Sequence, residues 1–140
     1  GVFSDHIDTI NRIGANSHTY DFNQLNKKFD LIFVDGDHSY KGVLNDTLKV
    51  FPLRKNDQSI IVWHDYGFNT ENTRYSTLKG ILDGIPKEKH KNLYHVSNTM
   101  CAVYIENLDL PTQFTKFPSF PNKKFSITLK GKKIISPNKS

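Results

Sequence analysis

The feature that most constrains this chain is a short apolar run, LIFV at 31–34, which leads directly into DGDH at 35–38. A run of this length, rich in β-branched and aromatic residues, is typical of a buried strand in a parallel sheet. A second such run, IIVW at 60–63, is followed by His64 and Asp65. Ligands bind outside the carboxyl ends of the strands in open α/β sheets, so both polar clusters are candidate site residues.

The residues between these two runs predict a helix over 40–51, with Ser39 as its N-cap and Pro52 at its end. Its apolar positions recur at helical spacing: Tyr40, Val43, Leu44, Leu48 and Phe51. A strand, a helix and a strand in this order predict a βαβ unit with parallel strands. Both polar clusters should then lie at the same edge of the sheet.

The chain after the second run predicts one more helix and a pair of strands. The helix is expected over 73–83, closed by Gly84 and Pro86. Two short apolar runs at 93–96 and 101–105 predict an antiparallel hairpin. The fold class is therefore α/β, with a parallel sheet that ends in an antiparallel hairpin.

The first 28 residues carry weaker patterns. Residues 3–7 are consistent with the last turn of a helix, and residues 9–14 with a strand. A turn is expected at 14–17, and a short helix or loop over 21–28.

The composition changes after residue 110, which divides the chain into a domain over 1–110 and a basic extension over 111–140. The extension has seven lysines and no acid, whereas the first 110 residues have a net charge of −2. It is rich in proline, and residues 125–135 predict a terminal hairpin. The lysines lack the clustered arginine and aromatic residues of a nucleic-acid reader, so no nucleic-acid partner is expected.

The length and cysteine content limit the class of protein further. A chain of 140 residues can form one domain with a core. No apolar run approaches the roughly 20 residues that span a bilayer, so no membrane association is expected. The lone Cys101 excludes an internal disulfide framework and suits a reducing compartment, which predicts a cytoplasmic protein. A homo-oligomer is left open.

The two strand-end clusters have a functional and a structural interpretation. Carboxylates at strand ends suit a hard divalent cation, and His64 and Asp65 could complete such a site with Asp35. Alternatively, Asp37 and Ser39 only cap the following helix, and the histidines pack or face solvent.

Other chemistries fit the motifs less well. An Asp-Gly-Asp strand end resembles the haloacid-dehalogenase phosphatases, in which the first acid is a nucleophile and the second a general acid. His64-Asp65 resembles the HD-type phosphohydrolases, but their pair lies on a helix. The chain has no Walker or G-x-G-x-x-G phosphate loop.

The sequence resembles class I S-adenosylmethionine-dependent methyltransferases, in the subgroup with a DG-x-H-x-Y strand end and a later HDY. The resemblance lies in FDLIFVDGDHSYKGVLNDTLKVFPL, SIIVWHDYG and the hairpin LYHVSNTMCAVYI, and it covers about residues 9–106. It implies a Rossmann-like fold, of which this chain holds the C-terminal part. In the related metal-dependent O-methyltransferases, the matching positions hold Mg²⁺ and would be Asp35, His64 and Asp65.

The resemblance also implies roles for other residues. His38 takes the place of the catalytic base, and Asn16 and Ser17 fall where a turn contacts the adenine of S-adenosylmethionine. Asp35 is a further expected cofactor contact. A histidine can take a hydroxyl proton near neutral pH because its pKa is about 6.5.

The acidic-glycine loop and the ribose-binding acid of that family are not found in residues 1–28. We therefore expect a chain that is truncated at its N-terminus and that binds the cofactor poorly or not at all on its own. The predicted activity is methyl transfer to a hydroxyl oxygen of a small molecule or sugar. The alternatives are a non-catalytic truncated domain that binds a partner or cation, and a haloacid-dehalogenase-like phosphatase.

Overall fold

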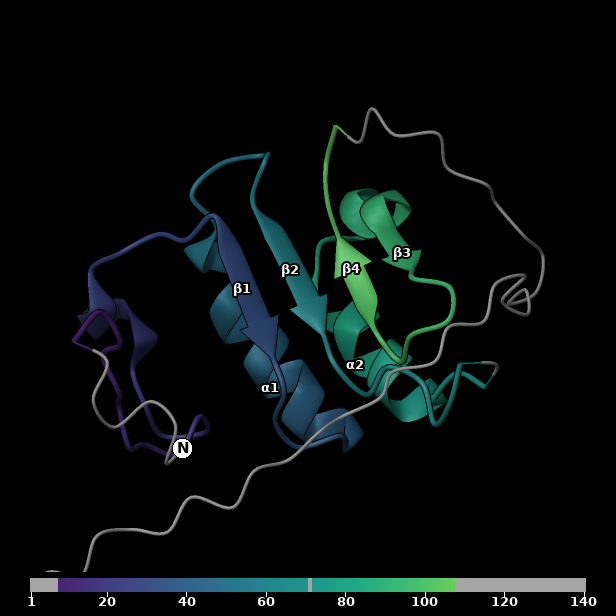
Figure 1. Cartoon of the computed structure of the whole chain (residues 1–140), viewed down its shortest axis with the longest axis horizontal. Helices are drawn as coiled ribbons and strands as arrows, with labels where there is room; N and C mark the ends of the chain where they lie inside the picture. Colours follow the sequence, from purple (N-terminus) through teal and green to yellow (C-terminus); the bar gives the residue numbers. More distant parts are fainter. Residues whose placement is uncertain (1–7, 71, 108–140) are drawn as a thin grey trace, which may run out of the picture.

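The computed structural model describes residues 8–70 and 72–107. Within these ranges the chain forms a mixed α/β structure with one sheet and two α-helices (Figure 1). The elements, with η for 3₁₀ turns, are η2 (Phe22–Leu25), β1 (Leu31–Val34), α1 (Tyr40–Val50), η3 (Phe51–Leu53), β2 (Ile60–Trp63), α2 (Tyr75–Gly84), η4 (Lys87–Asn92), β3 (Leu93–His95) and β4 (Ala102–Tyr104).

The predicted βαβ unit is confirmed. β1 and β2 are parallel neighbours, in a register that runs from Leu31 opposite Ile60 to Val34 opposite Trp63. The pairing extends one residue further, because the His64 N–H donates to the Val34 carbonyl at 2.9 Å. The two strands therefore end side by side, and the residues that follow them lie at one edge of the sheet.

The helix between these strands begins where the sequence predicts. Ser39 is the N-cap, and its hydroxyl accepts a hydrogen bond from the Gly42 N–H at 3.1 Å. This bond satisfies one of the backbone donors that have no partner inside the first helical turn. The helix ends at Val50, and η3 with Pro52 follows it directly.

The predicted hairpin is also confirmed, and it closes the sheet. β3 and β4 are antiparallel, and β4 is also antiparallel to β2. The order across the sheet is β1-β2-β4-β3, so β3 runs in the same direction as β1 and β2 (Figure 1).

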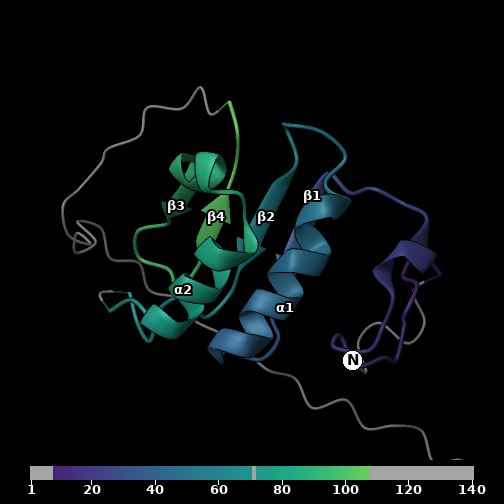
Figure 2. The same ribbon diagram turned by 180° about the vertical axis from the view of Figure 1, so that it is seen from behind.

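Both α-helices cover the same face of the sheet, and the core lies beneath them (Figure 2). Ile61, Trp63 and Tyr104 on the sheet are fully buried, as is Ile81 on α2. The buried Trp63 Nε1–H donates to Thr47 Oγ1 at 3.1 Å and so links β2 to α1. On β1, Leu31 and Phe33 are 62% and 59% exposed, and no helix of the described residues covers them.

Two glycines let α2 approach α1 closely. A Cβ at Gly80 would lie 2.9 Å from Val43 Cβ, and one at Gly84 would lie 2.6 Å from Thr47 Cβ. The expected helix over 73–83 runs over 75–84, and Gly84 is its last residue, without a positive φ. Gly84 is thus required for close packing of the two helices.

The strand expected over 9–14 is wrong. Residues 10–16 have no regular structure, and Ile10 and Ile13 are 46% and 48% exposed. A strand is stable only when its backbone pairs with a neighbour, and no described strand lies beside this segment. The turn lies slightly later than expected, since the Thr19 and Tyr20 N–H groups both donate to the Asn16 carbonyl.

Three expectations fall outside the described residues: the helical turn over 3–7, the hairpin within 125–135, and the structure of the basic extension over 111–140. The division of the chain at residue 110 therefore stays a prediction. Neither α-helix within the described ranges is long and apolar enough to cross a membrane.

Candidate functional site

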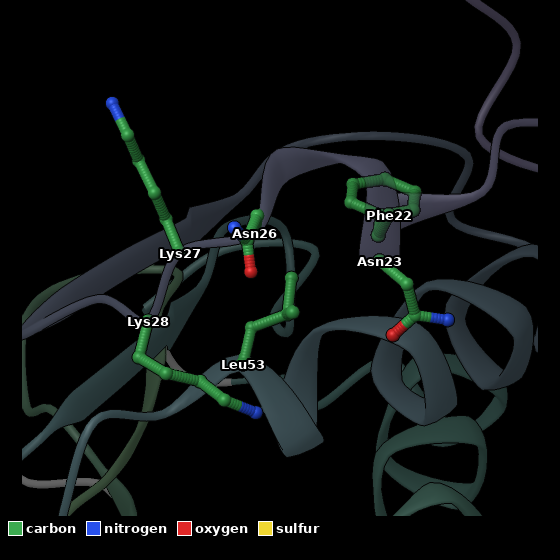
Figure 3. Close-up of a pocket in the computed structure, with 6 residues that line it drawn as sticks. All are labelled: Phe22, Asn23, Asn26, Lys27, Lys28 and Leu53. Carbon is green, nitrogen blue, oxygen red and sulfur yellow. The ribbon is translucent and has the colours of Figure 1, made fainter.

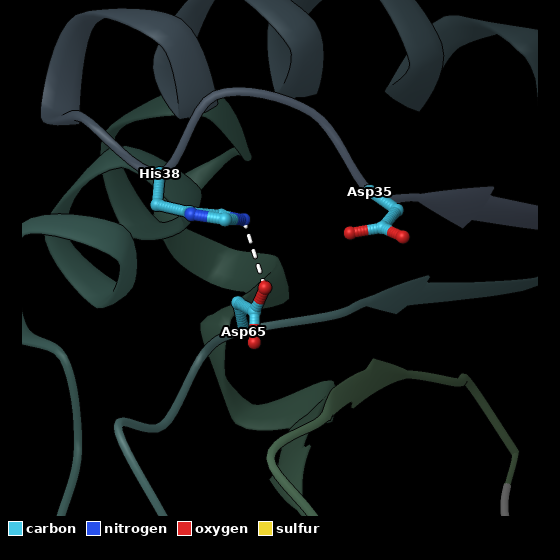
Figure 4. A group of neighbouring side chains, drawn as sticks. All are labelled: Asp35, His38 and Asp65. Atoms are coloured by element: carbon cyan, nitrogen blue, oxygen red, sulfur yellow. Dashed lines mark ion pairs between the residues drawn. The ribbon is translucent and has the colours of Figure 1, made fainter.

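Four polar side chains gather at the carboxyl edge of the β1–β2 pair. Asp35 directly follows β1, and His64 and Asp65 directly follow β2. The turn before α1 brings His38 to the same place, where it faces Asp65 (Figure 4). We call Asp35, His38, His64 and Asp65 the strand-end cluster.

Short distances connect the members of the strand-end cluster. His38 Nε2 lies 2.9 Å from Asp65 Oδ2. His64 Nδ1 lies 3.1 Å from Asp65 Oδ2 and 3.2 Å from Asp35 Oδ1. The two clusters that the sequence placed at one sheet edge are therefore in direct contact.

The backbone conformation at Asp65 directs its side chain into the cluster. Asp65 has φ 55°, in the left-handed region that few residues other than glycine adopt. Aspartate is among the residues that tolerate this region, and such conformations are concentrated at functional sites. The strand thus ends in a sharp change of direction at the residue that contacts both histidines.

The position of His38 is fixed through its backbone. Its carbonyl accepts a hydrogen bond from Thr77 Oγ1 at 3.3 Å, and Thr77 is buried on α2. Both helices therefore hold the turn that carries His38, one by its N-terminus and the other by this bond.

Asp37, which lies between Asp35 and His38 in the sequence, has a structural role. Its two carboxylate oxygens accept hydrogen bonds from the Ser39 hydroxyl and the Ser39 N–H. These bonds, the hydroxyl first, lower the pKa of Asp37, with smaller contributions from the nearby His38 and His18. The structural interpretation of Asp37 and Ser39 is therefore confirmed, whereas Asp35 and His38 face the cluster.

Asn16 and Ser17, the residues predicted to contact the cofactor, lie in the turn that precedes η2. Asn16 Oδ1 accepts a hydrogen bond from the His18 N–H at 2.9 Å, and the Ser17 carbonyl accepts one from Lys49 Nζ. Lys49 of α1 also donates to the His18 carbonyl, so this turn lies against α1. Their role toward a cofactor stays a prediction.

A surface pocket lies at the other end of β1 (Figure 3). Its lining residues come from the segment before β1 and from η3: Phe22, Asn23, Asn26, Lys27, Lys28 and Leu53. Lys28 Nζ donates to the Pro52 carbonyl, and the Lys27 side chain extends away from the pocket. The pocket contains no member of the strand-end cluster and contributes nothing to its chemistry.

The cluster offers carboxylate and imidazole groups, which can exchange a proton or bind a divalent cation. Asp35, His38 and Asp65 each have a potential ligand atom, and these atoms lie within 4.8 Å of one another. The sequence analysis predicted Asp35, His64 and Asp65 as metal ligands, and His38 only as the base. One signal could have suggested His38 as a ligand. It lies three residues after Asp35, across one turn.

Comparison with known proteins supports one family. Residues 4–66 match a family model described as a methyltransferase domain, over a little less than half of the chain. The matched part includes β1, α1, β2 and every member of the strand-end cluster. No curated protein and no solved structure matches the chain. The match supports a methyltransferase domain here, and methyl transfer as the general reaction.

Proposed function

We propose that this protein transfers a methyl group from S-adenosylmethionine to a hydroxyl oxygen of a small molecule or sugar, at the strand-end cluster. One observation carries the proposal. Two polar clusters from separate strands converge at the carboxyl edge of a parallel pair, inside the stretch that matches a methyltransferase domain. This edge is where ligands bind in open α/β sheets.

The chemistry requires little from the protein beyond positioning and a proton acceptor. The bound cofactor supplies an electrophilic methyl group on sulfur. The acceptor hydroxyl must lose its proton, and its oxygen must be held in line with the carbon–sulfur bond. Holding two reactants in this geometry accounts for much of the rate enhancement in such reactions.

In this proposal, His38 is the first candidate for the proton acceptor. It lies at the cluster with its side chain 38% exposed and its Nε2 atom buried beside Asp65, so the acceptor proton would go to Nδ1. The carboxylate of Asp65, 2.9 Å from Nε2, would stabilise the imidazolium that forms. General bases of this kind contribute about 10²- to 10⁴-fold to a rate.

The cluster also fits a divalent cation. Asp35 and Asp65 offer the oxygen ligands that Mg²⁺ prefers, and His64 lies within 3.2 Å of both carboxylates. A bound cation would orient the acceptor hydroxyl and lower the pKa of that hydroxyl. We propose Asn16, Ser17 and Asp35 as contacts of S-adenosylmethionine.

The structure favours this function over the phosphatase alternative. A haloacid-dehalogenase-type mechanism would need Asp37 as a general acid beside Asp35. Both Asp37 oxygens instead accept hydrogen bonds from Ser39 at the start of α1. The non-catalytic alternative, a domain that binds only a partner or cation, would show no affinity for S-adenosylmethionine.

Calorimetric titration of S-adenosylmethionine into the protein, in the full length that its gene encodes, tests the proposal. We expect saturable binding at one site per chain. Absence of binding, both with and without a divalent cation, would exclude methyl transfer. Loss of a phosphatase activity on Asp35→Asn would instead support the phosphatase alternative.

A further inference from the structure

One face of the sheet carries apolar side chains that no helix of the described residues covers. Alternate residues of a strand point to opposite faces, and Ile61 and Trp63 of β2 point into the core beneath the helices. The residues next to them therefore point to the other face, which we call the open face. The strand register gives its members: Leu31, Phe33, Ile60, Val62, Tyr94 and Val103. Figure 1 shows α1 and α2 behind the sheet, so the open face is toward the viewer.

The open face is apolar where such a surface is normally buried. Leu31 and Phe33 of β1 are 62% and 59% exposed, and the other members of the open face are half-buried. Parallel strands such as β1 and β2 occur almost only in sheets that are covered on both faces. A contiguous apolar patch on the surface marks a site of contact with another element or molecule. The open face therefore requires a covering partner.

The basic extension contains a segment whose pattern matches the open face. Residues 125–129 read FSITL, so Phe125, Ile127 and Leu129 would share one face of a strand, with polar residues between them. The sequence predicts a hairpin over 125–135, and an isolated hairpin is marginally stable at best in water. Two sheets with apolar inner faces pack about 10 Å apart and exclude water from both. The hairpin and the open face each supply what the other lacks.

The chain that leads to this segment is long enough to reach the open face. The described residues end at 107, shortly after β4, which lies between β2 and β3. Residues 108–124 can span roughly 55–60 Å when extended. Four strands at a spacing of about 4.8 Å make a sheet only about 15 Å wide. Every point of the open face is therefore within reach.

The charges of the two surfaces are complementary as well. Asp30 and Asp35 flank β1, with side chains that are 76% and 54% exposed. The extension has seven lysines and no acid, and it therefore carries only positive side-chain charge. A second copy of the chain would instead bring two open faces with the same acidic rim together, which is unfavourable. Charge thus favours the extension as the occupant.

We propose that residues 125–135 fold as a hairpin that packs on the open face, with its apolar side chains against β1 and β2. The proposal is independent of the proposed function, because it concerns the surface opposite the helices and involves no substrate. One contact connects it to the strand-end cluster, since the rings of Phe33 and His64 have centroids 6.1 Å apart. A hairpin that packs on Phe33 also supports the position of His64.

Hydrogen exchange, read by mass spectrometry on the protein in the full length that its gene encodes, tests the proposal. We expect the backbone amides of residues 125–135 to be protected from exchange. Leu31→Asn on the sheet and Ile127→Asn on the hairpin should each accelerate their exchange by about 10-fold or more, because each removes one side of the apolar contact.

Two matched variants serve as controls. Thr128→Asn changes the other face of the same predicted strand, and Leu48→Asn changes a leucine of α1 that is 54% exposed and lies outside the open face. Both should leave the exchange of residues 125–135 unchanged. Peptides from β2, whose Ile61 and Trp63 are buried, show in the same experiment that each variant is folded.

Three results would overturn the proposal. The first is rapid exchange of residues 125–135 in the native protein. The second is protection of this segment that persists in folded Leu31→Asn, above all if another segment of the protein loses protection and so is identified as the cover. The third is protection that appears only as the protein concentration rises, which would assign the open face to a second copy of the chain.

Discussion

Asp65 combines a demanding backbone conformation with contacts to both histidines of the strand-end cluster. Asparagine tolerates the left-handed region about as well as aspartate, whereas a β-branched residue does not. Asp65→Asn should therefore change the free energy of unfolding little, and Asp65→Val should lower it by about 1–2 kcal/mol. Urea denaturation of the two variants measures this difference. Equal stability of the two variants would contradict the role of the backbone conformation.

Glu106, a carboxylate outside the strand-end cluster, makes stability depend on pH. Burial alone would raise its pKa, but hydrogen bonds from Lys89, Tyr104 and Arg54 outweigh burial and lower the pKa to about 2. The unfolded chain binds the proton near the ordinary pKa of 4.5, so acid favours unfolding between about pH 4.5 and pH 2. On the alkaline side, burial and the bond to Glu106 raise the pKa of Tyr104 to about 12, so stability falls from about pH 10 upward.

We expect Glu106 to contribute on the order of 3 kcal/mol to the free energy of unfolding at neutral pH. This contribution is lost progressively as the pH falls from 4.5 to 2. The measurement is the free energy of unfolding against pH for the native chain and for Glu106→Gln, which cannot titrate. The native chain should lose more stability than the variant over this range. Parallel curves would show that the ion pairs of Glu106 contribute no such stability.

At the scale of elements, the contact between α1 and α2 depends on small residues. Alanine is normally favoured over glycine inside a helix by about 1 kcal/mol. At Gly80, however, a Cβ would lie 2.9 Å from Val43 Cβ and 3.0 Å from the Tyr40 carbonyl oxygen. Gly80→Ala should therefore destabilise the protein by about 1–3 kcal/mol, the range for overpacked cores.

Gly14→Ala is the matched control, because a Cβ at Gly14 would meet no atom within 4 Å. It should be neutral or slightly stabilising, since it reduces the freedom of the unfolded chain. Thermal unfolding of both variants compares them directly. A rise in the melting temperature of Gly80→Ala would mean that the helices adjust at no cost.

The elements that the sequence predicts well are those with a strong local pattern. α1 has apolar residues at helical spacing, a cap at Ser39 and a proline after its end, so its bounds are predicted to within one residue. The strand expected over 9–14 has only a short alternating pattern, and strands depend on partners far away in the sequence. That dependence is why the prediction failed there.

At the scale of the whole molecule, the meeting of Asp35 with His64 and Asp65 is predictable from topology alone. A βαβ unit places two strand ends at one edge, and the register of Val34 with Trp63 brings their next residues together. The direction of His38 is not predictable in this way. It depends on the turn that Asp37 and Ser39 fix, and on the bond from Thr77 of α2, which is distant in the sequence.

The central claim is that the strand-end cluster is the site of methyl transfer. Two aspartates flank the same strand and provide a matched pair of variants. Asp35 lies in the cluster after β1, whereas Asp30 precedes β1 and forms an exposed ion pair with Lys55. Exposed pairs contribute about 0–1 kcal/mol, so Asp30→Asn should leave the fold and the activity intact.

The most direct test is the rate of S-adenosylhomocysteine formation, in the full-length protein, with a panel of phenol and sugar acceptors. We predict formation that requires an acceptor, is retained in Asp30→Asn, and falls by about 100-fold or more in Asp35→Asn. Equal rates in the two variants, or no formation with any acceptor in a protein that binds S-adenosylmethionine, would contradict the claim.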